Sequence, residues 1–141
     1  MKIQKQLLSN DCWRTCLAIV MNMDAKDVPH FYEDQSLENA VQALQKAKLW
    51  LSENSKTLFA VNLPPELDFQ TVIQTAQTIF PKYPVIISGQ SKLGLNHAVV
   101  VGPHGAIIDP YIGEVVHMNN PFKGPCKNGC YGWIVEVIVP L

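Results

Sequence analysis

The sequence predicts an α+β fold, in which helices pack against a mostly antiparallel sheet. The first observation behind this prediction is that helical patterns come early in the chain, whereas most extended patterns come late. The second is the segment Gly102-Pro103-His104-Gly105 between two apolar runs, a strong signal for a turn between neighbouring strands. No internal repeat, linker or low-complexity tract divides the 141 residues, so we expect a single domain over residues 1–141.

Three segments have the apolar spacing of helices. We expect these helices over about residues 12–23, 36–51 and 69–80. Asp11 or Asn10 can cap the first helix and Ser36 the second, because short polar side chains accept hydrogen bonds from the free N–H groups at a helix start. Between these helices, Val28-Pro29 indicates a loop, since the residue before a proline avoids helical geometry.

The extended segments are expected to form the sheet. We expect strands over residues 56–63, 84–88, 96–102, 106–109, 114–118 and 132–139. Pro64-Pro65 ends the first of them, because proline has no N–H for the hydrogen bonds of a sheet. The strands at 96–102 and 106–109 flank the turn described above and are therefore expected to pair.

The charge pattern argues against nucleic acid as a partner. The chain has 11 Lys and Arg against 12 Asp and Glu, for a formal net charge of -1, and Arg14 is its only arginine. A nucleic-acid-binding protein usually has a basic stripe, whereas the lysines here are scattered.

The apolar pattern argues against a membrane as a partner. No run approaches the roughly 20 apolar residues that span a bilayer. The start of the chain reaches the polar run Ser9-Asn10-Asp11 before any long apolar stretch, unlike a signal peptide. We therefore expect a cytoplasmic protein, in which the cysteines at positions 12, 16, 126 and 130 stay reduced.

Cys12 is the candidate nucleophile. It stands where the first helix is expected to begin, directly after Ser9-Asn10-Asp11. The unsatisfied N–H groups and partial positive charge of a helix N-terminus favour a thiolate, and a nearby imidazole favours it further. The alternative is that Cys12 is a small buried hydrophobic residue, as many reduced cysteines are. The polar run favours the first interpretation, whereas Cys16, one turn further along, suits the core better.

His97 is the candidate base, and Asp109 is the carboxylate that would orient it. If Pro103 is the centre of the turn, His97 faces Asp109 directly, and if the turn has three central residues the two are diagonal neighbours on one face. Both registers leave the side chains within reach, whereas a two-residue turn would place them on opposite faces. An imidazole held by a carboxylate is the arrangement that thiol nucleophiles use. The alternative for Asp109, which precedes Pro110, is a simple turn residue.

These residues carry a family resemblance. The segment Gln6-Leu7-Leu8-Ser9-Asn10-Asp11-Cys12-Trp13 resembles the nucleophile segment of papain-like cysteine peptidases, in which a glutamine precedes the cysteine by six positions and an aromatic residue often follows it. The segments Asn96-His97-Ala98-Val99-Val100-Val101 and Ile108-Asp109-Pro110 resemble the later histidine strand and its following Asp-Pro. The closest resemblance is to compact bacterial and phage domains similar to bacteriocin-leader (double-glycine) processing peptidases.

The resemblance implies a papain-like fold, with the nucleophile helix packed on the sheet and a cleft between them. It implies that Gln6 supplies an oxyanion-hole donor beside the backbone N–H of Cys12. Trp13 and Asn96 are candidates for the wall of the cleft, and a place in the core is equally open for Trp13. The implied substrate is a protein or peptide, and no cofactor is implied.

Two thiols near the C-terminus form a separate pattern. Cys126 and Cys130 are spaced by four, and with His117 upstream they could hold zinc. Structural zinc sites usually have a second, tighter pair, so we expect no metal. The main interpretation is a glycine-rich loop with two thiols, which an oxidant could join as a disulfide.

Three further polar side chains are expected at the surface. Arg14 lies in the first turn of the nucleophile helix and is expected to pair with a surface carboxylate, with an anionic substrate group as the alternative. His30 in its loop and His104 at the turn tip are expected to face solvent.

The leading functional hypothesis is a cysteine hydrolase that cleaves a peptide, isopeptide or related amide bond through Cys12, His97 and Asp109 and an acyl-enzyme. The same triad could run acyl transfer, as in a transglutaminase, or deamidation, because these reactions differ in what enters the cleft second. A non-catalytic binding module on the same fold, phage-encoded and acting on a host factor, is the hypothesis from a different class. The substrate sequence and the oligomeric state stay open.

Overall fold

The computed structural model of the protein describes residues 1–33, 37–116, 120–126 and 132–141. The helices are α1 (Cys12–Met21), α2 (Leu37–Glu53) and α3 (Phe69–Ile79), with a short 3-10 helix, η1 (Ala25–Asp27). The strands are β1 (Lys56–Leu63), β2 (Val85–Ser91), β3 (Asn96–Val101), β4 (Ile107–Asp109), β5 (Glu114–Val116), β6 (Phe122–Gly124) and β7 (Trp133–Pro140).

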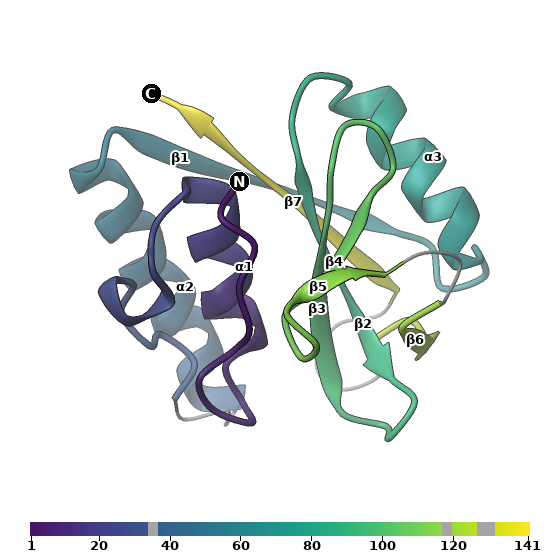
Figure 1. The fold of residues 1–141 in the computed structure, drawn as a ribbon, viewed down its shortest axis with the longest axis horizontal. Coiled ribbons are helices and arrows are strands. Elements are labelled where there is room, and N and C mark those ends of the chain that lie inside the picture. Colours follow the sequence, from purple (N-terminus) through teal and green to yellow (C-terminus); the bar gives the residue numbers. More distant parts are fainter. Residues whose placement is uncertain (34–36, 117–119, 127–131) are drawn as a thin grey trace.

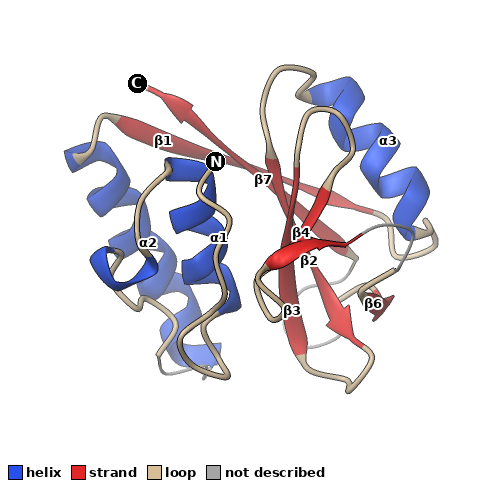
Figure 2. Ribbon diagram, in the orientation of Figure 1, coloured by secondary structure: helices blue, strands red, loops and turns tan. Residues whose placement is uncertain are grey.

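The strands form one seven-stranded sheet within the described residues (Figures 1 and 2). Its order is β1-β7-β2-β3-β4-β5, and β6 pairs with β2. Every strand pair in this part of the chain is antiparallel. The predicted α+β class with a mostly antiparallel sheet is therefore confirmed.

Helices cover both faces of the sheet. Figure 1 shows α1 and α2 on one side and α3 on the other. Successive side chains of a strand point to opposite faces: Ile86 and Val100 join the core beneath α1 and α2, whereas Ile87 and Val99 join the core beneath α3. Because both faces are covered, the central strands are apolar runs without polar alternation. Each fully buried aliphatic side chain contributes roughly 1.5–3 kcal/mol to stability.

The first helix ends two residues earlier than expected. Asn22 adopts a left-handed conformation with φ of 59°, and its N–H reaches the carbonyls of Ala18 and Ile19. This left-handed cap closes α1 at Met21. The cap expected at Ser36 and the end of the strand expected at residues 117 and 118 lie outside the described residues.

Two short elements were not predicted. η1 occupies three residues in the segment before the predicted loop. β6 is three residues long, lies between Pro121 and Pro125, and pairs with β2 across an irregularity at Gln90 and Ser91. Neither element is long enough to show a period of apolar residues, so the sequence pattern could not reveal them.

The N-terminal segment, residues 1–6, connects two layers of the fold. In Figure 1 it runs beside α1 before turning into that helix. The N–H of Lys2 donates to the carbonyl of Ile19 at 3.1 Å, and the N–H of Gln6 donates to the carbonyl of Pro110 at 2.8 Å. The segment is therefore hydrogen-bonded to α1 near its start and to the turn after β4 near its end, just before the chain reaches Cys12.

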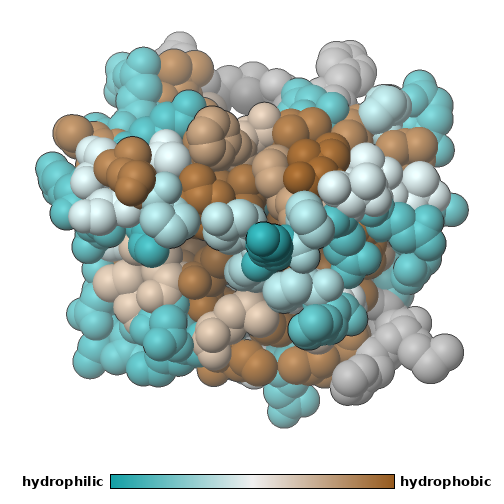
Figure 3. Space-filling model, turned by 90° about the horizontal axis from the view of Figure 1, so that it is seen from above, coloured by the Kyte–Doolittle hydropathy of each residue, from teal (hydrophilic) through white to brown (hydrophobic). Residues whose placement is uncertain are grey.

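Hydrophobic residues also reach the surface. Figure 3 shows one face, on which hydrophilic residues dominate the margins and hydrophobic residues gather in patches toward the middle. Among the residues that the structure describes, no helix has the length and apolar character needed to cross a bilayer.

Candidate active site

The three predicted catalytic residues border one cavity. Cys12 is the first residue of α1, His97 lies near the start of β3, and Asp109 is the last residue of β4. All three line a cavity of about 880 Å³. Helix α1 packs against β3, which brings the helix N-terminus and the histidine strand together from distant parts of the chain.

The His97 and Asp109 side chains are in direct contact. Val101 pairs with Ile107, so the turn has three central residues. His97 and Asp109 are therefore diagonal neighbours, the second of the two registers considered above. His97 Nε2 lies 3.0 Å from Asp109 Oδ1. The same Asp109 oxygen accepts the backbone N–H of Tyr111 at 2.9 Å. The carboxylate is therefore fixed by two partners and holds the imidazole in one orientation.

The environment of His97 favours its protonated form. The pKa of the imidazole is raised from its ordinary 6.5 to about 9. Burial is the largest single influence and lowers this pKa, but the hydrogen bonds and negative charges of Asp109 and Cys12 together outweigh it. His97 is therefore protonated at neutral pH. An imidazolium beside the Cys12 sulfur favours the thiolate, which is the nucleophilic form of a cysteine.

Phe122 and Gly89 support the imidazole from the sheet. The Phe122 ring lies with its centroid 5.8 Å from that of His97. Gly89 pairs with His97 across β2 and β3, and its missing side chain leaves room for Phe122 and Trp133. Sequence reasoning did not find Phe122, because its place beside His97 depends on the long-range pairing of β6 with β2.

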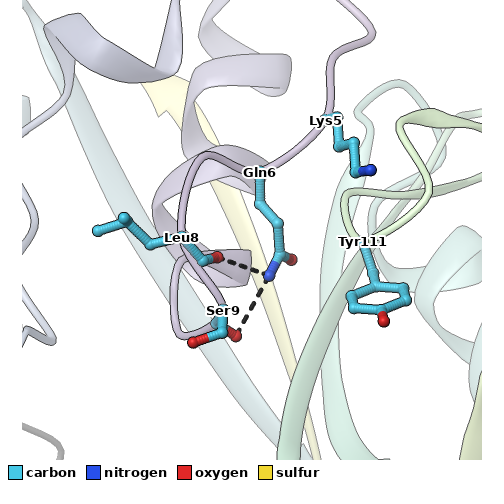
Figure 4. A pocket seen from close by; sticks show the side chains of 5 residues that line it. All are labelled: Lys5, Gln6, Leu8, Ser9 and Tyr111. Carbon is cyan, nitrogen blue, oxygen red and sulfur yellow. Dashed lines mark hydrogen bonds between the residues drawn. The ribbon is translucent and has the colours of Figure 1, made fainter.

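Gln6 also lines the cavity, but both of its amide hydrogens are in use. Its Nε2 donates to the carbonyls of Leu8 at 2.8 Å and Ser9 at 3.2 Å (Figure 4). Its Oε1 is buried and has no hydrogen-bond donor among the described residues. In this conformation the Gln6 amide offers no hydrogen to the cavity, so the expected oxyanion role requires the side chain to turn away from Leu8 and Ser9.

Asp11 precedes the candidate nucleophile but does not cap the helix with its side chain. It holds the N-cap position as expected, yet its carboxylate makes no capping hydrogen bond. Instead Oδ2 accepts the N–H of Leu7 at 3.3 Å and lies 3.5 Å from Arg14 Nη1, while Oδ1 lies 3.6 Å from His30 Nε2. Arg14 and His30 hold the fully buried carboxylate away from the helix N–H groups.

Arg14, His30 and His104 differ in how far they reach the surface. Arg14 pairs with a carboxylate, as expected, but Asp11 is buried and not at the surface. The prediction that His30 faces solvent is wrong: its side chain is only 12% exposed, because it packs toward Asp11. His104 is exposed at the turn tip, as predicted.

Trp13 and Asn96 have different positions. Asn96 is exposed and lines the cavity. Trp13 packs against the core beneath α1, with its ring edge-on to Tyr32 at 5.0 Å between centroids. Trp13 therefore takes the core alternative: its indole N–H donates to Glu136, and it is not among the residues that line the cavity.

Glu136 is a buried acid that sequence reasoning missed. It lies on β7 with 6% exposure, and its Oε1 accepts the indole N–H of Trp13 at 2.8 Å. Burial raises its pKa from 4.5 to about 7, against the opposite effects of the Trp13 hydrogen bond and the Lys48 charge. A single acid within the apolar run Ile134-Val135-Glu136-Val137-Ile138 is the signal that could have revealed it.

We expect Glu136→Gln to remove a pH dependence of stability. Because the folded state raises this pKa, the folded protein binds the proton more tightly than the unfolded chain. The contribution of Glu136 to the free energy of unfolding is therefore fully present below pH 4.5. It is lost as the pH rises through about 7. This loss of stability amounts to at most about 3 kcal/mol. The Glu136→Gln variant should not lose stability in this pH range, because glutamine has no charge but still accepts the hydrogen bond from Trp13. Denaturant unfolding of both proteins across this pH window measures the difference, and parallel curves would refute the prediction.

The remaining thiols differ from Cys12. Cys16 is fully buried, and burial, followed by the neighbouring negative charges, raises its pKa well above the ordinary value. Of the residues considered for zinc, Cys126 is described, whereas His117 and Cys130 lie outside the described residues. Within the described residues, no three His, Cys, Asp or Glu side chains are grouped closely enough to hold a metal ion.

Comparisons with protein-family models, with curated proteins and with solved structures find no match to this chain. A functional proposal must therefore be built on the geometry of the site and on the residues that compose it.

Proposed function

We propose that this chain is a cysteine hydrolase of papain-like type that cleaves a peptide, isopeptide or related amide bond. The observation that carries the proposal is the meeting of Cys12, at the N-terminus of α1, with the His97–Asp109 pair at one cavity. The raised pKa of His97 supports it, because a protonated imidazole stabilises a thiolate and later supplies a proton. The packing of α1 on an antiparallel sheet is consistent with the papain-like fold.

The proposed reaction has two halves. The Cys12 thiolate attacks the carbonyl carbon, and His97 gives its proton to the leaving amine as the C–N bond breaks. The product of this half is a thioester on Cys12. Neutral His97 then takes a proton from water, whose oxygen attacks the thioester, and the C–S bond breaks to restore the thiolate–imidazolium pair. Asp109 keeps the imidazole oriented in both halves.

The tetrahedral oxygen needs hydrogen-bond donors in each half. The backbone N–H of Cys12 is available, since the first N–H groups of a helix have no acceptor within that helix. Gln6 is the candidate for the second donor, after its Nε2 leaves the carbonyls of Leu8 and Ser9. One such donor is typically worth about 100- to 1000-fold in rate.

The proposal includes an environment in which thiols stay reduced, such as the cytoplasm. The thioester is also the intermediate for acyl transfer and deamidation, so these reactions fall within the same proposal for the site. The alternative is a binding module without catalysis, and the next experiment distinguishes it from an enzyme.

A model ester tests the proposed chemistry without knowledge of the natural substrate. With p-nitrophenyl acetate, we expect a burst of p-nitrophenol and one acetyl group on Cys12, seen by mass spectrometry, followed by slower turnover. Cys12→Ser should abolish the burst. Cys16→Ala is the matched control, because Cys16 is a fully buried thiol one turn away, and it should keep the burst. Equal ester cleavage by the wild type and Cys12→Ser would exclude Cys12 as the nucleophile and favour the binding module.

A further inference from the structure

Large apolar side chains stand exposed around the candidate active site. The turn between β2 and β3 carries Leu93 and Leu95, which are 84% and 65% exposed. The turn between β4 and β5 carries Tyr111 and Ile112, which are 64% and 49% exposed. All four line the same cavity as Cys12. Exposed apolar residues that gather around one cavity indicate a ligand with apolar groups of its own.

The charges around this cavity are mostly positive. Lys92 lines the main cavity, and Lys5 lines a smaller pocket that shares Gln6, Ser9 and Tyr111 with it. Figure 4 shows Lys5 and Tyr111 beside Gln6 in this pocket. Asp109 is the one acidic residue in either lining among the described residues, and its carboxylate is already bound to His97 and to the N–H of Tyr111. The lining therefore complements a negative charge on the ligand.

The size and the polar groups of the cavity suit a peptide. A volume of about 880 Å³ lies toward the upper end of the usual range for ligand pockets, so it admits several residues. Ser9, Asn10 and Asn96 also line it and can hydrogen-bond to a peptide backbone. An extended segment with apolar side chains could thus lie between the two apolar turns.

We propose that the substrate is a peptide segment that combines a large aliphatic or aromatic side chain with a nearby carboxylate. The apolar side chain lies between Leu93 and Leu95 on one wall and Tyr111 and Ile112 on the other, and the carboxylate faces Lys92 or Lys5. This inference rests on the proposed function, because it takes Cys12 as the reacting atom of the cleft.

Four alkylating peptides test the inference on the wild-type protein. An iodoacetyl group is attached to Leu-Leu-Glu, Leu-Leu-Lys, Gly-Gly-Glu and Gly-Gly-Lys, and the rate at Cys12 is divided by the rate with iodoacetamide itself. We expect Leu-Leu-Glu to react at least about tenfold faster than Gly-Gly-Glu, as burial of leucine side chains allows. We expect a smaller preference, roughly threefold, for Glu over Lys, which weakens as salt is added.

Substitutions of exposed residues show which contacts cause the preference for glutamate and which cause the preference for leucine. Lys92→Glu should reverse the preference between Glu and Lys peptides, whereas Lys82→Glu, at an exposed lysine away from the cavity, should leave it unchanged. Leu93→Ser combined with Leu95→Ser should remove most of the leucine preference. The matched control is Leu49→Ser on α2, since Leu49 is 63% exposed and does not line the cavity.

The outcomes separate the two proposals. If iodoacetamide shows no preference for Cys12 over the other thiols, the proposed function fails and the inference fails with it. If Cys12 reacts selectively but takes all four peptides at equal rates, only the substrate class is overturned. A leucine preference that survives the double substitution would likewise overturn the assignment to the β2–β3 turn.

Discussion

Replacing His97 by alanine is expected to reduce the turnover of p-nitrophenyl acetate by about 100- to 10,000-fold, the usual contribution of a positioned acid–base group. Without the imidazole, Cys12 loses the cation proposed to stabilise its thiolate, and the water that attacks the thioester loses its base. His97 also gives the buried Asp109 a hydrogen bond and a neighbouring charge, so the substitution affects the whole pair. Steady-state rates and the size of the burst measure the effect.

Two further variants make this prediction specific. His97→Gln still presents an amide donor to Asp109 but cannot carry the proton, so it should be as inactive as His97→Ala even where it folds better. His104→Ala removes an exposed histidine at the turn tip and should keep full activity. If His97→Gln retained turnover within about threefold of the wild type, acid–base catalysis by His97 would be excluded.

Gly89→Ala is expected to destabilise the fold by about 3 kcal/mol, the upper end of the range for an overpacked core. A Cβ atom on Gly89 would lie 2.7 Å from the Trp133 ring, 2.8 Å from the carbonyl oxygen of Gly124 and 2.9 Å from the Phe122 ring. These separations are far shorter than ordinary van der Waals contacts, so the rings must move. Because Phe122 lies beside His97, we also expect ester turnover to fall by roughly tenfold or more.

The chain contains a matched control for this substitution. A Cβ atom on Gly124, in the neighbouring strand β6, would meet nothing within 4 Å. Gly124→Ala should therefore change both the midpoint of denaturant unfolding and the turnover very little. Equal effects of the two substitutions would show that chain stiffness, and not the space beside Phe122, is the reason for the loss.

Local patterns predicted the elements that depend on short stretches of chain. The strand at residues 56–63 has the same bounds as β1, because two prolines end it. The contact between His97 and Asp109 was predictable in the same way, since a short hairpin permits few registers and two of them give the same face. The exact end of α1 was not predictable, because it depends on the left-handed conformation of Asn22.

Features that depend on contacts distant in sequence were missed. Phe122 reaches His97 only through the pairing of β6 with the end of β2, and Glu136 meets Trp13 only when α1 packs on the sheet. The extension of β2 to Ser91 was missed because its polar end has no apolar period, although it pairs with both β3 and β6. The oxyanion-hole role of Gln6 was inferred from family resemblance. A resemblance identifies the residue, but it does not predict the hydrogen bonds that Gln6 makes to Leu8 and Ser9.

The most direct test of the account is the rate at which each cysteine of the native protein reacts with iodoacetamide between about pH 6 and pH 9, followed by mass spectrometry. We predict that Cys12 reacts first already at pH 6, and that its lead over the other thiols narrows as the pH rises through the His97 pKa of about 9. Cys16 and Cys126 are buried and should react more slowly, and a thiol without a neighbouring cation reacts faster as the pH rises toward its pKa. A Cys12 that is unreactive at pH 6 and accelerates in parallel with the other cysteines would contradict the proposed thiolate–imidazolium pair.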